Sequence, residues 1–181
     1  MDAAVLTEVG GRPEFAQFQD PVARDGCVVV QVAAAGVNHL DIAKASGGFY
    51  LGPPTVPSAL GSDGVGRLAD GRRLFFDTTV ALFGAWAQQS LVPEASLLAV
   101  SDWVDDAVAA ALGNAVLAAW LSLDWRARLQ PGECVVVLGA TGAMGSAAVQ
   151  IAKILGAKRV VGVDVDEVRL AELQGADATV S

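Results

Sequence analysis

The sequence predicts an α/β protein with a β-rich N-terminal part followed by the first strands of a parallel sheet. Roughly the first hundred residues contain short apolar or alternating runs separated by Gly, Pro and Asp. The chain then becomes helical, and its last third begins with a strand, a glycine-rich turn, a helix and a second strand. We expect a domain boundary near Leu112 to Asn114, dividing the chain into domains 1–112 and 113–181.

The N-terminal part is expected to contain strands at "AAVLT", "CVVVQVAAAG", "RLFF" and "SLLAV". In the second of these, Val28, Val30 and Val32 share one face, as a half-buried strand requires. The segment "NHLDIAKASG" predicts a short helix that Asn38 caps and Gly47 ends. The following "GGFYLGPPTVPSALGSDGVG" is rich in Gly and Pro, which favours an irregular loop over a site.

The segment "DWVDDAVAAALGNAVLAAWLSLDWRARL" predicts helix. Residues 107–123 carry no charge and approach the length of a membrane span, but Gly113 and Asn114 interrupt them and Asp residues bracket them. We expect two buried helices joined at Gly-Asn. The net charge of −8 argues against binding to nucleic acid or to an anionic membrane. The N-terminus shows no signal peptide, so we expect a soluble, cytoplasmic protein.

The chain offers few ligands for a metal ion. Cys27 and Cys134 each begin a Val-rich run, and we expect both to be buried, reduced thiols in strands. His39 is the single histidine, and the sequence has no C-x-x-C pair. A zinc site is therefore not expected.

The C-terminal part predicts alternating strands and helices. After a turn at "PG", a strand is expected at 134–138, a helix at 142–155, a strand at 159–164 and a helix at 166–173, and "ADATV" begins a third strand. In the turn "GATGAMG", Ala140, Gly142 and Gly145 occupy the three positions of a G-x-G-x-x-G fingerprint. A small first residue lets the chain turn sharply. Gly142 lets the backbone approach a pyrophosphate, and Gly145 lets the helix pack closely on the strand. The expected cofactor-binding residues of the turn are Ala140, Thr141, Gly142, Ala143, Met144 and Gly145.

Asp164 ends the second strand of this part, 19 residues after Gly145. An acid at this position can accept hydrogen bonds from the adenosine ribose hydroxyls and would repel a 2′-phosphate, which favours NAD(H) over NADP(H). In the simpler interpretation, Asp164 only caps the next helix together with Asp166. The succession of strand, turn, helix, strand and acid favours dinucleotide binding.

The segments "AAAGVNHLDIAKASGGFYLGPPTVPSALGSDGVG", "AAWLSL", "LQPGE" and "VVVLGATGAMG" occur in one order along essentially the whole chain. In this order and spacing the chain resembles the zinc-independent quinone oxidoreductases of the medium-chain dehydrogenase/reductase superfamily. The resemblance implies a GroES-like β domain followed by a Rossmann domain. Relatives continue for further strands, so the chain resembles the N-terminal portion of such an enzyme, with a truncated Rossmann unit.

The resemblance also implies the type of chemistry. Zinc-dependent relatives have a cysteine at the position of Asn38 and a histidine–glutamate pair at Ser62-Asp63, so no metal ligands are expected here. The implied activity is NAD(P)H-dependent hydride transfer to a quinone, enone or carbonyl substrate, which depends on positioning and on polar stabilisation of the oxyanion. The alternative is a catalytically inactive nucleotide-binding or interaction protein that needs a complementary chain or forms a homodimer.

The resemblance suggests individual site residues. Asn38 and Asp41 match an N-x-x-D motif near the nicotinamide, although a helix cap and a first-turn acid explain them equally well. Tyr50 matches a tyrosine of the loop after this helix and could donate a hydrogen bond to a substrate carbonyl, and ring packing is an equally good explanation. Asn114 lies near the junction where relatives line the cleft between the domains and is an expected cofactor contact, although the end of a helix also explains it. His39 is expected to be a solvated surface residue.

Two departures from the family remove polar groups. Ala43 and Ala118 stand where relatives often have a tyrosine and a threonine.

Overall fold

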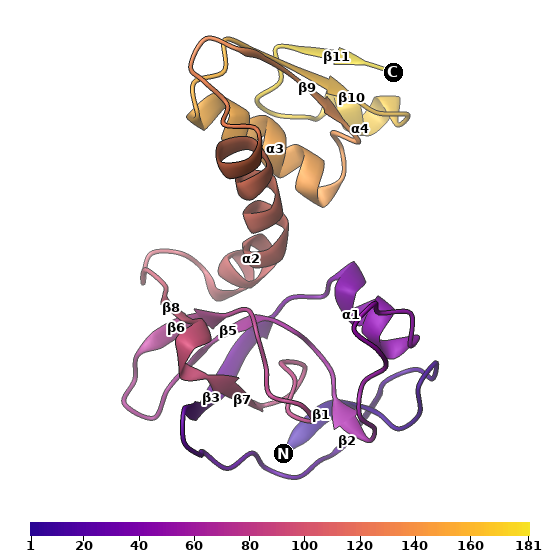
Figure 1. Ribbon diagram of the computed structural model, residues 1–181, viewed down its shortest axis with the longest axis vertical. Coiled ribbons are helices and arrows are strands. Elements are labelled where there is room, and N and C mark those ends of the chain that lie inside the picture. The colour runs from indigo at the N-terminus through magenta and orange to yellow at the C-terminus, as the bar shows by residue number, and fades with distance from the viewer. The chain divides into compact units, whose positions relative to one another are not determined.

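The computed structural model describes residues 1–181, which form two compact units, 1–114 and 115–181 (Figure 1). The division falls within helix α2 (Asp106–Trp120), the helix in which the expected boundary after residue 112 also lies.

The first unit consists of two antiparallel sheets, which confirms the predicted β-rich domain. The smaller sheet has the order β2-β1-β4, and the larger, curled sheet has the order β7-β3-β5-β6-β8. The strands of the smaller sheet are β1 (Asp2–Leu6), β2 (Glu14–Gln17) and β4 (Ser58–Ala59). Those of the larger sheet are β3 (Cys27–Ala35), β5 (Gly64–Arg67), β6 (Arg73–Phe76), β7 (Gln89–Pro93) and β8 (Leu97–Ala99), with a 3-10 turn at Glu94–Ser96 before β8.

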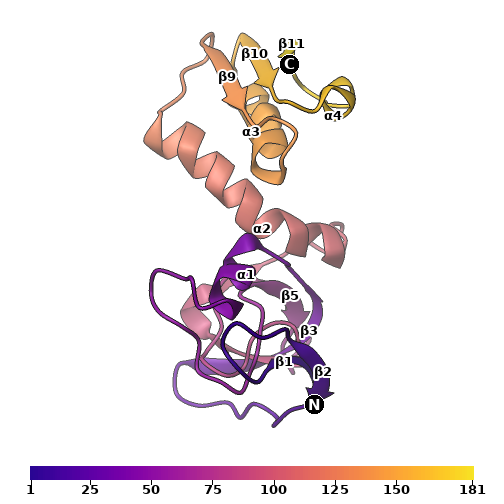
Figure 2. The ribbon, with the colours of Figure 1, turned by 90° about the vertical axis from the view of Figure 1, so that its right-hand side faces the viewer.

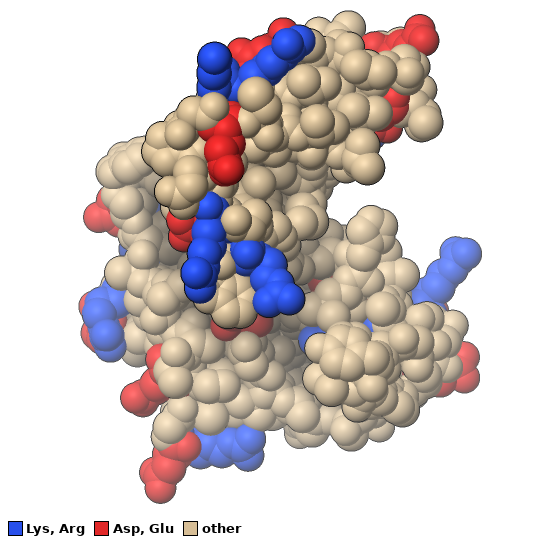
Figure 3. Space-filling model, turned by 45° about the horizontal axis from the view of Figure 1, so that its top comes forward, with Lys and Arg blue, Asp and Glu red and all other residues tan.

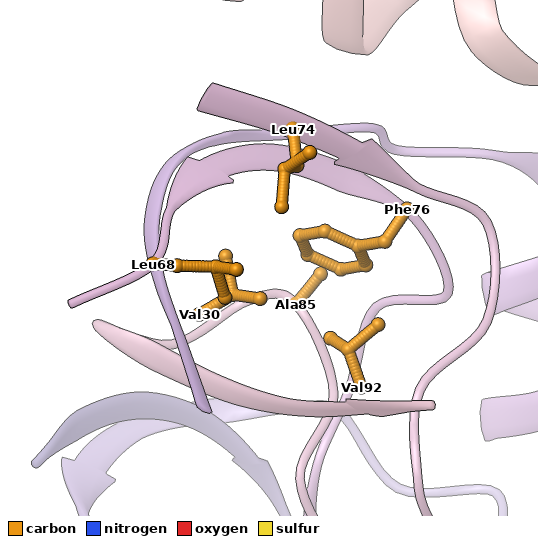
Figure 4. Close-up of a cluster of buried hydrophobic side chains, with 6 residues drawn as sticks. All are labelled: Val30, Leu68, Leu74, Phe76, Ala85 and Val92. Atoms are coloured by element: carbon orange, nitrogen blue, oxygen red, sulfur yellow. The ribbon is translucent and has the colours of Figure 1, made fainter. Parts of the chain in front are cut away.

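One hydrophobic cluster of the first unit lies within the curl of the larger sheet. Val30 is fully buried there, and Val28 and Val32 pack against the same cluster, as the alternation in β3 predicts. Burying an aliphatic or aromatic side chain of this size contributes about 1.5–3 kcal/mol. The buried members of the cluster are Val30, Leu68, Leu74, Phe76, Ala85 and Val92 (Figure 4).

Helix α1 (His39–Ala45) forms where predicted, but the long loop expected after it does not extend as far as residue 66. Strands β4 and β5 lie within the expected loop. The glycines of β5 face β3 at short range: a Cβ on Gly64 would lie 2.8 Å from the carbonyl oxygen of Ala34. These positions need glycine because β3 and β5 approach closely, and the backbone there forms a strand.

The prediction of two helices joined at Gly113-Asn114 was wrong, because this stretch forms the single helix α2. Gly113 lies inside the helix, where a Cβ would collide with the ring of Phe75, so it serves packing rather than termination. One glycine costs a helix only about 1 kcal/mol, and the alanines and leucines around it are strong helix formers. The helix continues into a π-helical turn at Leu121–Arg126.

By length and hydropathy alone, the stretch Asp106–Arg126 could cross a membrane, and only 11% of its most apolar 18-residue window is buried. A single helix of this kind is weak evidence for a membrane span, and the buried helices expected here are not found.

A buried arginine fixes the beginning of α2. Arg73 in β6 is 9% exposed, and its Nη2 lies 2.6 Å from Oδ1 of Asp106. The same guanidinium donates hydrogen bonds of 2.6 Å to the carbonyl oxygens of Ser101 and Val104. Its charge is therefore paired and most of its donors are used, as a buried guanidinium requires.

The second unit is a three-stranded parallel sheet with the order β11-β10-β9, which confirms the predicted βαβ arrangement of a partial Rossmann fold. Helix α3 lies along one face of β9 and β10 (Figure 2). Val149 of α3 and Val160 of β10 are fully buried between them. The elements are β9 (Cys134–Leu138), α3 (Ala143–Ile154), β10 (Arg159–Val163), α4 (Glu167–Ala171) and β11 (Ala178–Val180).

The opposite face of β9 is open. Val136 and Leu138 are 63% and 77% exposed, and Cys134 on the same face is exposed too. Both cysteines are free thiols in strands, as expected. The expectation that they are buried was wrong, because Cys134 lies on this open face and Cys27 is only half-buried. On the face drawn in Figure 3, basic and acidic side chains are interspersed and most of the surface is uncharged.

Candidate nucleotide site and polar pocket

The glycine-rich turn follows β9 directly. Gly139 has a φ of +71°, a conformation that suits glycine, and turns the chain off the strand. The backbone N–H groups of Gly139 and Ala140 both donate to the carbonyl oxygen of Val163, at 2.9 and 3.1 Å. These bonds tie the turn to the end of β10, and Ala140 is completely buried beneath it.

The start of α3 lies very close to this turn. A Cβ on Gly145 would collide with the carbonyl oxygen of Gly139, so only glycine allows the helix to pack here. Gly142 occupies the N-cap position, and no side chain caps the helix. The first-turn amides, including those of the exposed residues Ala143 and Met144, are therefore open to an anionic ligand.

Asp164 follows β10 and lies beside the turn. Its Oδ2 accepts hydrogen bonds from the backbone N–H and the hydroxyl of Thr141, at 2.9 and 2.7 Å. Its Oδ1 accepts one from the N–H of Val165 at 2.7 Å. The bonds from Thr141, and then the bond from Val165, lower the pKa of Asp164 to about 2. Asp166, not Asp164, caps α4, through the N–H of Arg169.

A polar network surrounds the beginning of α1 in the first unit. Oδ2 of Asp41 accepts a hydrogen bond from the N–H of Asn38 at 2.9 Å, which ties the N-cap to the first turn. Oδ1 of Asp41 accepts one from the hydroxyl of Ser62 at 2.7 Å, and that hydroxyl accepts one from Nζ of Lys44 at 2.8 Å. Asp41 is only 1% exposed, so its carboxylate depends on these donors.

Asp63 is the member of this network that has a buried oxygen without a hydrogen-bond partner. It is 4% exposed, its Oδ1 accepts a 2.7 Å hydrogen bond from Nδ2 of Asn38, and its Oδ2 has no partner. Gly36 makes room for it, because a Cβ there would lie 2.7 Å from Oδ1 of Asp63. Burial, followed by the nearby charge of Asp41, raises the pKa of Asp63 to about 6, while the bond from Asn38 acts in the opposite direction.

The remaining predicted residues lie apart from these clusters. Tyr50 is 85% exposed and stacks at a tilt against Phe49, with ring centroids 4.5 Å apart. Asn114 is exposed on α2, and His39 is exposed at the start of α1. The structure brings Asn38 and Asp41 into one network and the turn residues together with Asp164.

The sequence interpretation missed the contribution of Lys44 and considered Ser62 and Asp63 only as residues that are not metal ligands. The available signal was "GSDG", a polar pair between glycines in an apolar context. Its partners lie on α1, 18 to 25 residues earlier in the chain.

No protein-family model matches the chain. Among curated proteins, it is 31% identical over 172 residues to the quinone oxidoreductase of Homo sapiens, and the match covers 87% of this chain and 51% of that protein. The rat quinone oxidoreductase is 33% identical with the same coverage. The chain thus spans about half the length of these relatives. It is also 35% identical over 167 residues to 7% of a phenolphthiocerol/phthiocerol polyketide synthase of Mycobacterium tuberculosis.

Solved structures give the same result. The quinone oxidoreductase of Thermus thermophilus, which was also solved in complex with NADPH, has a TM-score of 0.86 and 35% identity, over 99% of this chain and 59% of that one. A quinone oxidoreductase of Pseudomonas syringae pv. tomato has a TM-score of 0.87 and 31% identity, over 99% and 58%. These neighbours confirm the GroES-like domain with a partial Rossmann unit.

Proposed function

We propose that the chain is part of a zinc-independent, NAD(P)H-dependent oxidoreductase. The proposal rests on its homology to the N-terminal part of the quinone oxidoreductases in the medium-chain dehydrogenase/reductase superfamily. The reaction is hydride transfer to a quinone, enone or carbonyl compound. A cytoplasmic location belongs to the same proposal, since both cysteines are free.

The observation that carries the proposal is the pairing of Thr141 with Asp164. It holds a charged carboxylate at the end of β10, beside a turn in which only glycine fits at position 145. A pyrophosphate would accept hydrogen bonds from the first-turn amides of α3, and the adenosine ribose would donate to Asp164. When bound, the nicotinamide supplies the hydride. The chain's own residues bind and orient the dinucleotide.

Asp164 also supports a preference for NAD(H). Its carboxylate is ionised at neutral pH and would repel the 2′-phosphate of NADP(H). In the first unit, Asn38 is proposed to contact the nicotinamide end of the cofactor, with Asp41 as the buried acid that fixes its backbone. Tyr50 and Asn114 remain proposed contacts of substrate and cofactor.

The residues at the positions of the family's zinc ligands do not fit a zinc ion. Asn38 and Ser62 are poor zinc ligands, and the amide of Asn38 is already bonded to Asp63. No group of three or more His, Cys, Asp or Glu side chains converges on one point. We therefore propose that hydrogen-bond donors stabilise the substrate oxygen.

The test is a fluorescence titration of the 181-residue chain with NADH and with NADPH. We expect saturable binding that is tighter for NADH, and loss of the preference in Asp164→Ala. Asp166→Ala, which removes a neighbouring acid that caps α4, is the matched control and should keep the preference. Binding of neither nucleotide to the wild-type chain would contradict the proposal that the residues of this chain by themselves bind the dinucleotide.

The open face of the parallel sheet favours a second candidate function, an inactive interaction protein that associates with a copy of itself or with a complementary chain. The observation is the exposure of Val136 and Leu138 on a strand whose outer edge is also unpaired. Sedimentation at increasing concentration tests it: self-association of the wild type that Leu138→Lys abolishes would support this function, and a monomer at all concentrations would exclude the homodimer.

A further inference from the structure

We propose that a pocket in the first unit binds the neutral carbonyl oxygen of a small apolar compound through the ammonium group of Lys44. This inference rests on the proposed function, because it assigns the substrate's oxygen to a particular residue. The pocket has a volume of about 230 Å³. Drug-sized ligands occupy pockets of about 300–1,000 Å³, so the expected occupant is smaller, of the size of a single ring.

The walls of the pocket combine apolar and polar groups. Loops after α1 and before β7 contribute apolar side chains, and Asp41, Lys44 and Ser62 form a charged and polar cluster on one side. The hydroxyl residues Thr55, Ser58 and Thr79 also line the pocket, and none of them is charged. The larger apolar lining side chains are Phe49, Leu51, Pro54, Leu60, Val80 and Leu82. A ligand suited to these walls has an apolar body and one electron-rich oxygen.

The direction of the hydrogen bonds shows which groups are available to a ligand. The single hydroxyl proton of Ser62 is donated to Oδ1 of Asp41, and the same hydroxyl accepts from Lys44 at 2.8 Å. Each oxygen of Asp41 accepts one hydrogen bond, Oδ2 from the N–H of Asn38, and a carboxylate has no proton to donate to a ligand oxygen. Lys44 has three N–H donors and uses one, so two remain for a ligand oxygen.

The position of the ammonium is restrained on two sides. Ser62 holds it at one side, and the ring of Phe49 lies beneath it, with Nζ 5.5 Å from the ring centroid. The ammonium is therefore ordered before a ligand arrives, which reduces the entropy lost on binding.

Charge decides between a carbonyl and a carboxylate. Asp41, linked through Ser62, already balances the charge of Lys44, and Asp63 lies behind the same network. A carboxylate ligand would add a negative charge beside these buried acids, whereas a ketone, enone or quinone oxygen adds none. The pocket thus selects neutral carbonyl compounds.

The experiment measures binding of three one-ring probes to the 181-residue chain by ligand-observed NMR: cyclohexanone, cyclohexanecarboxylate and cyclohexene. The wild type should bind cyclohexanone most tightly. Lys44→Met keeps the alkyl stem and should weaken cyclohexanone binding about tenfold or more, the loss expected for a hydrogen bond from a charged donor. Binding of cyclohexene should stay unchanged, which a general distortion of the pocket would not allow.

Matched variants complete the design. Ser62→Ala releases Lys44 and should weaken cyclohexanone binding, while Lys158→Met removes an exposed lysine of the second unit and should have no effect. Equal cyclohexanone binding by Lys44→Met and wild type, tighter binding of cyclohexanecarboxylate, or no binding of cyclohexanone would each overturn the inference. NADH titration of the wild-type chain separates the two proposals, because a chain that binds cyclohexanone but no nucleotide contradicts only the proposed function.

Discussion

Replacing Asp63 by asparagine should make the free energy of unfolding less dependent on pH. The carboxylate is buried, one of its oxygens lacks a partner, and its pKa is about 6 instead of 3.8. Between these two pKa values the folded chain holds a proton that the unfolded chain has released. The contribution of the Asp63 carboxyl group to the free energy of unfolding is therefore fully present below pH 3.8 and is lost as the pH rises through 6.

The size of the effect follows from the two pKa values. A difference of roughly two units corresponds to about 3 kcal/mol, since one unit is worth about 1.36 kcal/mol. Asparagine is nearly isosteric, keeps an oxygen to accept from Asn38 and carries no charge. The free energy of unfolding of Asp63→Asn minus that of the wild type should thus rise by up to about 3 kcal/mol as the pH rises from about 4 to about 7, because only the wild type loses stability over this range.

Two assays check this expectation. Urea unfolding followed by circular dichroism from about pH 4 to pH 8 measures the difference in stability, and carbon-13 NMR of the aspartate carboxyl groups should reveal one midpoint near 6 that is missing in Asp63→Asn. Asp70→Asn is the control, because hydrogen bonds from Arg72 lower the pKa of this exposed carboxyl and its effect has the opposite sign. A constant difference between Asp63→Asn and wild type across this range would refute the reasoning.

Two further substitutions test packing and charge pairing. Gly145→Ala places a methyl group against the backbone of the turn and should destabilise the second unit by about 1–3 kcal/mol in thermal unfolding. Gly142→Ala is the control and should cost less, because the nearest atom to its methyl group would be 3.4 Å away. Equal losses of stability in the two variants would contradict the packing argument. Asp106→Ala leaves the buried guanidinium of Arg73 without its carboxylate and should lower the free energy of unfolding by about 3 kcal/mol. Asp102→Ala removes an exposed carboxylate and should change the free energy of unfolding little. Similar losses in both variants would show that the ion pair does not stabilise the fold.

Local patterns were sufficient for the elements that depend on near neighbours. The alternation of Val28, Val30 and Val32 predicted β3, and the succession of apolar run, glycine-rich turn and helix predicted the βαβ unit. The distance from Gly145 to Asp164 identified the acid beside the turn, because that spacing is set by one helix and one strand.

The elements that sequence patterns missed depend on contacts between distant segments. The glycines of β5 suggested a loop, and only the adjacent strand β3 explains them. Gly113 suggested a helix end, and only the ring of Phe75 gives its actual role. The contacts of Lys44 with Ser62, and of Asn38 with Asp63, join residues at α1 to a turn much later in the chain, which no local periodicity encodes.

The hydrogen bonds from Thr141 have a consequence for cofactor choice at low pH. Because they hold the pKa of Asp164 at about 2, this carboxylate keeps its negative charge throughout the range in which the chain would be assayed. A monoester phosphate, by contrast, loses its second negative charge near about pH 6. If the proposed preference for NADH exists, its weakening on acidification would therefore report protonation of the 2′-phosphate of NADPH, because the charge of Asp164 stays the same.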